Sequence, residues 1–306
     1  MHKNLVLKEI LKDPHLKDFI LVILGPSASG KTFLSLKLAS NLQTSILSAD
    51  SRQVYKHLDY STGKIKKGDT FKYTKKPFRW VINNINYWGY DVIEPNKAFS
   101  AGDFVSFTQE VTSKEIKPPI IVGGTGLYIK SIFGGLNLSL PLANKRKRAE
   151  LEKKSVLELQ AILKKRGFPV SSLNPSDLMN KRRLIRKIEL MDFKKVSNKT
   201  FSLEDFYNKK AFYVYLERKS YNDLIEEWIV ENFKFIEKEV NWLLKKYPQS
   251  PLFEGFIFKE FKLFLQGSLT YSSTVQQIAT SYLKYIKRQK TYFKKYFPNA
   301  KKFIID

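Results

Sequence analysis

The sequence predicts an α/β fold in which helices flank a core of parallel strands. Three observations predict it. An apolar strand at residues 19–24 runs through a glycine-rich turn into a helix at 31–42, and a second strand follows at 45–49. Further apolar strands lie at 118–122 and 211–216, separated by stretches with helical periodicity. A strand–helix–strand start of this length requires a right-handed crossover, so the strands are parallel.

The turn between the first strand and the first helix reads G-P-S-A-S-G-K-T. This is G-x-x-x-x-G-K-[ST] between a strand and a helix, a pattern that cradles phosphate. The glycines let successive N–H groups point at one anion, and the helix N-terminus adds partial positive charge. Lys31 supplies a full charge, and Thr32 offers a hydroxyl to Mg²⁺. The core is therefore P-loop NTPase-like, and its predicted diphosphate- or nucleotide-binding residues are Gly25, Pro26, Ser27, Ala28, Ser29, Gly30, Lys31 and Thr32.

Two later strands deliver polar residues to the same edge as this phosphate loop. The strand at 45–49 is followed by Asp50, and the strand at 118–122 is followed by a G-G-T turn that ends in Thr125. Ligands of open parallel sheets bind outside the carboxyl ends of the strands. We therefore expect the loop, Asp50 and Thr125 to form one active site. The carboxylate is either a general base or a group that supports magnesium, and the residues alone leave both roles open.

The second prominent feature is charge, because 54 Lys and Arg stand against 29 Asp and Glu, a formal net charge of +25. This excess indicates either a polyanionic partner such as nucleic acid or a lysine-biased proteome. Residues 261–305 contain no acid, and the predicted helix at 276–297 carries a basic face and an aromatic face. We interpret the aromatic face as core packing. Exposed helices normally interleave acids with bases, so the basic face favours nucleic-acid binding.

The sequence pattern divides the chain into two domains. Residues 1–136 and 206–306 are expected to form the catalytic core with the C-terminal helices, and residues 137–205 a helical insertion. Within the insertion, one helix is expected over residues 148–166. Residues 60–98, rich in lysine and aromatic side chains, are expected to form a mobile, substrate-facing region.

Composition narrows the cellular setting. The chain has no cysteine, which excludes disulfides and thiolate metal sites. Its apolar runs are short and interrupted by charge, and its first 18 residues lack a signal-peptide core. We therefore expect a cytoplasmic protein that does not associate with membranes.

Six motifs, in order along nearly the whole chain, resemble those of the tRNA dimethylallyltransferases, the bacterial tRNA isopentenyltransferase family. The phosphate loop resembles the family's G-P-T-A-S-G-K-T, and residues 50–55 (D-S-R-Q-V-Y) resemble D-S-x-Q-x-Y. The other four are residues 100–104 (S-A-G-D-F), 122–128 (V-G-G-T-G-L-Y), 183–189 (R-L-I-R-K-I-E) and 285–289 (Y-I-K-R-Q), which resemble Y-S-x-x-D-F, G-G-T-x-L-Y, R-L-x-R-A-L-E and Y-A-K-R-Q.

The resemblance implies transfer of a dimethylallyl group from dimethylallyl diphosphate to the exocyclic amine of adenosine 37 in the tRNA anticodon loop, giving isopentenyl-adenosine and diphosphate. It implies that Lys31 and Thr32, with Mg²⁺, neutralise the diphosphate, that Asp50 accepts the adenine proton, and that Thr125 positions the adenosine. It also implies that the helical insertion binds tRNA. We expect the protein to be a monomer. The implied tRNA-binding residues are Asp50, Ser51, Arg52, Gln53, Thr125, Arg148, Lys287, Arg288 and Gln289.

The chain departs from the family pattern at Leu283 and near Trp228, where the family has arginine. Two other functions are compatible with a phosphate loop. The first is an ATP-dependent small-molecule kinase, which has no evident use for the acid-free C-terminal part. The second is an RNA-binding protein whose phosphate loop has lost its function, and intact Lys31, Thr32 and Asp50 argue against it.

Overall fold

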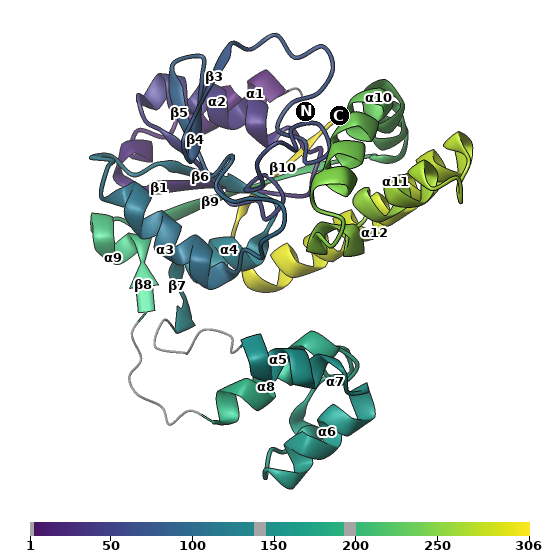
Figure 1. Cartoon of the computed structure of the whole chain (residues 1–306). Helices are drawn as coiled ribbons and strands as arrows, with labels where there is room; N and C mark the ends of the chain where they lie inside the picture. The colour runs from purple at the N-terminus through teal and green to yellow at the C-terminus, as the bar shows by residue number, and fades with distance from the viewer. Residues whose placement is uncertain (1–2, 138–144, 193–199) are drawn as a thin grey trace. The chain divides into compact units, whose positions relative to one another are not determined.

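The structure is a computed structural model, and the residues that it describes are 3–137, 145–192 and 200–306 (Figure 1). These residues form two compact units. The core unit comprises Met1–Gly134 and Ser202–Asp306, and the insertion unit comprises Gly135–Phe201. The insertion expected at residues 137–205 therefore begins and ends slightly earlier in the chain than the sequence analysis placed it.

The core unit is built on an eight-stranded sheet within the described residues. In order across the sheet the strands are β10 (Lys301–Ile305), β9 (Ala211–Arg218), β1 (Ile20–Leu24), β6 (Ile120–Gly123), β2 (Ile46–Ser48), β5 (Ile85–Trp88), β4 (Arg79–Ile82) and β3 (Tyr73–Lys76). Neighbours from β10 to β5 run parallel, whereas β4 and β3 are antiparallel additions. All five residues of β1 are buried, as expected for a parallel strand with both faces covered.

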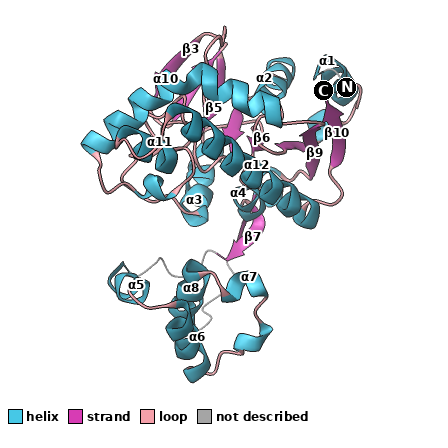
Figure 2. Ribbon diagram, turned by 90° about the vertical axis from the view of Figure 1, so that its right-hand side faces the viewer, coloured by secondary structure: helices cyan, strands magenta, loops and turns pink. Residues whose placement is uncertain are grey.

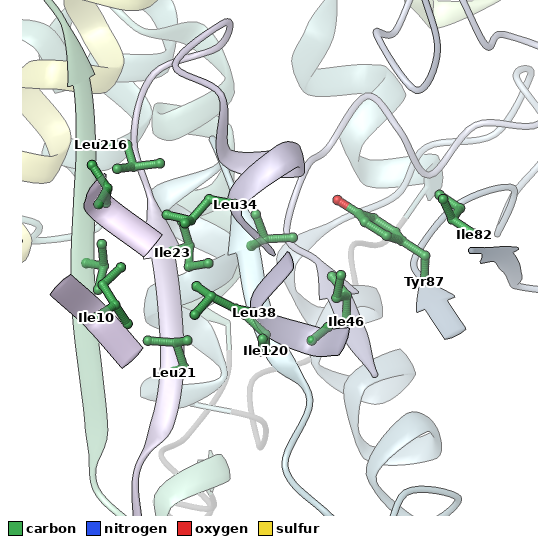
Figure 3. Packing of buried hydrophobic residues seen from close by; sticks show 14 of the residues in the cluster. Ile10, Leu21, Ile23, Leu34, Leu38, Ile46, Ile82, Tyr87, Ile120 and Leu216 are labelled. Atoms are coloured by element: carbon green, nitrogen blue, oxygen red, sulfur yellow. The ribbon is translucent and has the colours of Figure 1, made fainter. Parts of the chain in front are cut away.

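Helices cover both faces of this sheet (Figure 1). The helices of the core unit are α1 (Lys3–Leu11), α2 (Lys31–Leu42), α3 (Ala101–Thr112), α4 (Gly126–Ser131), α9 (Leu203–Tyr207), α10 (Asn222–Lys246), α11 (Phe258–Leu265) and α12 (Tyr271–Tyr296), with short 3₁₀ turns at Leu16–Asp18 and Pro251–Glu254. On the face of α1 and α2, Leu34 and Leu38 pack in one cluster with Ile23 of β1 and Ile120 of β6 (Figure 3). None of the described helices is long and apolar enough to cross a membrane.

Residues 60–98, for which the sequence predicts a mobile, substrate-facing region, include regular structure, and their mobility stays a prediction. They contain β3, β4 and β5. Buried ion pairs and hydrogen bonds hold residues 59–64, which precede these strands, in one conformation. The Lys64 side chain is fully buried, and its ammonium lies 2.5 Å from Asp91 Oδ1 and 3.3 Å from Asp59 Oδ1. Glu239 of α10 accepts hydrogen bonds from three successive backbone N–H groups at residues 59–61. A buried lysine with two carboxylates is stable only in a well-defined geometry.

The C-terminal helices α10, α11 and α12 lie beside the sheet (Figure 2). Their buried apolar side chains form a second hydrophobic core. α12 packs against both α10 and α11. It begins five residues before the predicted helix, because the Thr270 side chain accepts a hydrogen bond from the Ser273 N–H and caps it. On the face predicted to be apolar, Ile278, Ile286, Gln289 and Phe293 are buried and Tyr282 and Tyr285 are half-buried. On the face predicted to be basic, Lys284, Lys287, Arg288 and Lys295 are exposed, as expected.

The insertion unit is a small helical bundle. Its helices are α5 (Lys145–Glu152), α6 (Val156–Lys165), α7 (Pro175–Leu178) and α8 (Lys181–Met191), with a 3₁₀ turn at Val170–Ser172. Leu159 and Leu163 of α6 pack against Leu184 and Ile188 of α8. The single helix expected over residues 148–166 is wrong, because Ser155 starts a new helix through a capping box with Glu158. The strands β7 (Phe133–Asn137) and β8 (Thr200–Ser202) pair where the chain leaves and re-enters the core unit.

Candidate active site

The phosphate loop joins the end of β1 to the start of α2. Gly25 has a φ of +154°, and a Cβ atom built on it would lie 2.2 Å from the Leu216 carbonyl oxygen of β9, so only glycine fits there. Ala28 and Gly30 also have positive φ angles, of 62° and 84°. These three positive φ angles curl the backbone tightly before α2 begins. The turn therefore has the curled backbone that the sequence pattern predicts, and its binding of an anion stays a prediction.

Lys31 lies at the first position of α2 and folds back over the loop. Its Nζ donates hydrogen bonds to the Pro26 carbonyl at 2.6 Å and to Ser29 Oγ at 3.5 Å. Burial lowers the pKa of the Lys31 ammonium to about 8, and the negative charge of Asp50 opposes that shift. The side chain is thus a cation near neutral pH, held where a phosphate group would enter, and it is electrostatically coupled to the carboxylate on the neighbouring loop.

Asp50 follows β2 and is half-buried. Its Oδ1 accepts a hydrogen bond from the Arg52 N–H at 2.9 Å, which fixes the carboxylate within its own turn. Its Oδ2 lies 3.7 Å from the position that a Cβ atom on Gly124 would occupy. The carboxylate therefore lies between the turn after β2 and the G-G-T turn after β6, with the Lys31 charge within electrostatic range.

Thr125 joins these two turns directly. Its Oγ1 accepts a hydrogen bond from the Ser51 N–H at 2.9 Å and lies 3.2 Å from Ser51 Oγ. Its own N–H donates to the Ala49 carbonyl at 3.1 Å. Because β2 and β6 are adjacent and parallel, their carboxyl ends bring Asp50 and Thr125 together beside the phosphate loop. The structure thus gathers the three groups that the sequence placed at one sheet edge.

Arg52 and Gln53 have internal partners. Arg52 Nη2 donates to the Phe256 carbonyl at 2.8 Å, and its guanidinium lies 4.1 Å from the centroid of the Phe256 ring. Gln53 Oε1 accepts from Ser48 Oγ at 2.8 Å, and its Nε2 donates to the Gly63 carbonyl at 3.2 Å. That these side chains contact tRNA stays a prediction, since both already stabilise the turn after β2.

Three tyrosines near the site were not predicted as site residues. The Tyr282 hydroxyl interacts with the side chain of Ser27, and the Tyr285 hydroxyl with that of Thr125. Tyr87 of β5, on the α2 face of the sheet (Figure 3), interacts with the Thr32 side chain, and burial raises its pKa to about 12. The first two belong to the aromatic face of the helix, which we interpret from the sequence as core packing. Their spacing on one helix face was the available signal, because a core needs no hydroxyl groups.

The predicted tRNA-binding cations fall into two kinds. Lys287 and Arg288 are exposed on α12. Arg148, in the insertion unit, makes a bidentate pair with Glu189, with Nε–Oε1 and Nη2–Oε2 distances of 3.0 and 2.7 Å. Glu189 is only 3% exposed. The Arg148 guanidinium thus neutralises a buried acid and connects α5 to α8, while its side chain remains 37% exposed. That it contacts tRNA stays a prediction.

The prediction that Gln289 contacts tRNA phosphates needs correction. It is 5% exposed and lies on the inner face of α12, whereas a contact to tRNA phosphates requires an outward side chain. Its amide is hydrogen bonded to the phosphate loop and to the G-G-T turn.

The residues that stand at the family's arginine positions are apolar and partly buried. Leu283 and Trp228 pack in the C-terminal core, where the Trp228 and Tyr282 ring centroids lie 5.8 Å apart.

Comparison with known proteins identifies the family of this chain. A model of the family described as IPP transferase matches residues 53–296. A tRNA dimethylallyltransferase of Streptococcus pyogenes serotype M6 is 31% identical over 284 residues, which cover 90% of this chain and 87% of that protein. A tRNA dimethylallyltransferase of Streptococcus equi subsp. equi is 30% identical over 291 residues, covering 91% and 89%.

Solved structures show the same fold. A full-length tRNA isopentenylpyrophosphate transferase of Bacillus halodurans matches with a TM-score of 0.62 at 24% identity, over 95% of this chain and 92% of that one. A eukaryotic dimethylallyltransferase acting on tRNA matches with a TM-score of 0.70 at 18% identity, over 94% and 74%. From the family match and the identity to its members, the chain belongs to the tRNA dimethylallyltransferase (IPP transferase) family.

Proposed function

We propose that this protein transfers a dimethylallyl group from dimethylallyl diphosphate to the exocyclic amine of adenosine at position 37 of tRNA, giving isopentenyl-adenosine and diphosphate. The observation that carries the proposal is the meeting of three loops at one sheet edge. The cation of Lys31, the carboxylate of Asp50 and the hydroxyl of Thr125 come together there. Together they offer an anion site for a leaving group and an acceptor for a proton.

The proposed chemistry assigns one task to each loop. The phosphate loop binds the diphosphate through its N–H groups, and Lys31 offsets the charge that grows on it as the carbon–oxygen bond breaks. The adenine amine attacks the dimethylallyl carbon from which the diphosphate departs and forms the new carbon–nitrogen bond. Asp50 accepts the proton that the amine loses. Thr125, whose hydroxyl accepts a hydrogen bond from the turn after β2, orients the adenine.

The residues fit a magnesium ion, which we propose as the cofactor. Mg²⁺ takes few protein ligands and binds instead to phosphate oxygens and water. In the described part of the chain, no group of three or more His, Cys, Asp or Glu could hold a metal by itself. Thr32 at the start of α2 is the residue that would hold the ion together with the diphosphate. The ion would supply further neutralisation of the leaving group.

The anticodon loop is the proposed site of attachment on tRNA. A base can be reached by this edge only when it leaves the stack of the loop, and such a base requires hydrogen bonds and stacking partners. The exposed cations of α12 are suited to the flanking phosphates. We propose that the enzyme acts as a monomer. A cytoplasmic location stays a prediction.

The experiment is a transfer assay with Mg²⁺, labelled dimethylallyl diphosphate and an unmodified tRNA transcript that carries adenosine at position 37. A matched transcript with guanosine at that position is the control. We expect label on the first transcript and none on the second. Absence of transfer together with ATP-dependent phosphorylation of a small molecule would support the kinase alternative instead. Absence of transfer with tight tRNA binding would support the RNA-binding alternative.

A further inference from the structure

Gln289 of α12 lies between the two halves of the candidate site. Its Oε1 accepts a hydrogen bond from the Ser27 N–H of the phosphate loop at 3.0 Å. Its Nε2 donates to the Gly124 carbonyl of the turn after β6 at 2.9 Å. The side chain is 5% exposed. One buried amide therefore connects the loop that would bind the diphosphate with the turn that would receive the adenosine.

The contact accepts only one kind of side chain. The phosphate loop presents an N–H donor and the turn presents a carbonyl acceptor, so the bridge must carry one acceptor and one donor at a fixed separation. An amide has both. A carboxylate of the same shape would lose the donor and face a carbonyl oxygen, and an aliphatic side chain would leave two buried polar groups without this partner.

The backbone next to Gln289 is shaped around it. A Cβ atom built on Gly124 would lie 2.4 Å from Gln289 Nε2, a contact that real side chains do not make. The same position is 3.7 Å from Asp50 Oδ2. Glycine at 124 thus permits the close approach of the amide, and the bridge ends beside the carboxylate that we assign as the proton acceptor.

Other residues on the same face of α12 reach the same loops. Tyr282, about two turns before Gln289, interacts with Ser27, and Tyr285, about one turn before it, interacts with Thr125. The helix is anchored by Ile278, Ile286 and Phe293 in the core. It therefore forms a rigid frame that contacts both the donor side and the acceptor side of the site.

We propose that Gln289 is a positioning residue for prenyl transfer, which holds the phosphate loop and the turn after β6 at the separation that the reaction needs. This inference rests on the proposed function. The diphosphate and the adenine are bound by different loops, so a change in loop separation leaves each binding site largely intact but misaligns the reacting atoms. Misplacement by about 1 Å can cost on the order of 100-fold in rate.

The test compares Gln289→Glu and Gln289→Leu with the wild-type protein. The matched control is Gln277→Leu, because Gln277 is an exposed glutamine on the same helix. Single-turnover transfer rates, KM for dimethylallyl diphosphate and tRNA, and thermal unfolding are measured for each. We expect both Gln289 variants to react on the order of 10- to 100-fold more slowly, with KM values close to wild type and the control unchanged.

A Gly124→Ala variant approaches the same contact from the other side. Its methyl group displaces the amide, so we expect the same loss of rate without a matching rise in KM. If Gln289→Leu does not fold, the inference is tested with Gly124→Ala and Gln289→Glu.

The outcomes separate the two proposals. A wild-type protein that transfers no prenyl group overturns the proposed function and this inference with it. An active wild type with folded Gln289 variants that react at the wild-type rate overturns this inference alone. A defect confined to KM, or a lower unfolding temperature with an unchanged rate for folded protein, also overturns it, because the first indicates ligand binding and the second only stability.

Discussion

The outer face of α12 and the insertion unit differ in the partners of their basic side chains. On α12 of the core unit, Lys287 and Arg288 are exposed, and within the described residues no acid forms an ion pair with either. In the insertion unit, Arg148 and Arg186 both pair with Glu189, and Arg166 pairs with Asp192. The two regions look alike in sequence, since both are rich in lysine and arginine.

The difference teaches that a basic stretch predicts a nucleic-acid surface only where acids are absent nearby in space. A cation that neutralises a buried carboxylate is part of the internal structure, and its loss leaves an unpaired charge. A cation with only solvent around it keeps its full charge for a phosphate. Residues 261–305 lack acids altogether, whereas α8 carries Glu189 on its buried side.

The largest expected effect concerns the chemistry at the sheet edge of the core unit. Asp50→Ala should lower the single-turnover rate by about 10²- to 10⁴-fold, because the adenine amine loses its proton acceptor. Binding of tRNA, measured by filter retention, should remain. Asp223→Ala, which removes an exposed carboxylate from α10, is the control. If Asp50→Ala keeps most of its rate, Asp50 is not the proton acceptor, and the alternative role, support of the magnesium ion, is favoured.

The next effect tests the internal role of cations in the insertion unit. Arg148→Ala should lower the free energy of unfolding of this unit by about 1–3 kcal/mol, because Glu189 stays buried and keeps Arg186 as its remaining arginine partner. Urea unfolding measures it. The double variant Arg148→Ala, Glu189→Gln should recover part of the loss, since the buried charge is then gone. Unchanged stability with weaker tRNA binding would instead place Arg148 on the tRNA surface.

A pH dependence follows from Lys31. Its pKa is lowered to about 8, so the ammonium is charged below that pH and loses its proton above it. Because the charged form binds the diphosphate, kcat/KM for dimethylallyl diphosphate should fall about tenfold for each pH unit above about 8. Lys31→Arg keeps its charge throughout this range, so its profile should lack the alkaline fall whatever its absolute rate. A wild-type profile that stays flat to pH 10 would contradict this assignment.

The smallest effect concerns the outer face of α12. Reversing Lys287 and Arg288 to glutamate should weaken tRNA binding and reduce the slope of log affinity against log salt by about 1–2, as lost phosphate contacts release fewer counterions. Lys37→Glu, at an exposed lysine on α2, is the control. Binding isotherms at several salt concentrations measure the slope. An unchanged slope would show that Lys287 and Arg288 do not contact tRNA phosphates, so the outer face of α12 would no longer differ in function from the insertion unit.

Local sequence patterns predicted the loops and strand ends that form the candidate site. The phosphate loop, the strands that end at Asp50 and at the G-G-T turn, and the parallel order between them follow from glycine positions, apolar runs and crossover handedness. The β3–β5 extension was missed because its strands are short and its lysines and asparagines resemble a loop. The break at Ser155 was missed because the apolar periodicity continues across it while the cap acts on only a few residues.

The sequence by itself determined which chemical groups this protein has and at which edge of the sheet they lie. Only the tertiary structure decided the partner of each polar side chain. Gln289 and Ser27 are 262 residues apart, and Arg148 and Glu189 are 41 residues apart. The physical reason is range: backbone conformation is set by neighbours in the chain, whereas neutralisation of a charge or satisfaction of an amide depends on whichever group folding brings within 3 Å.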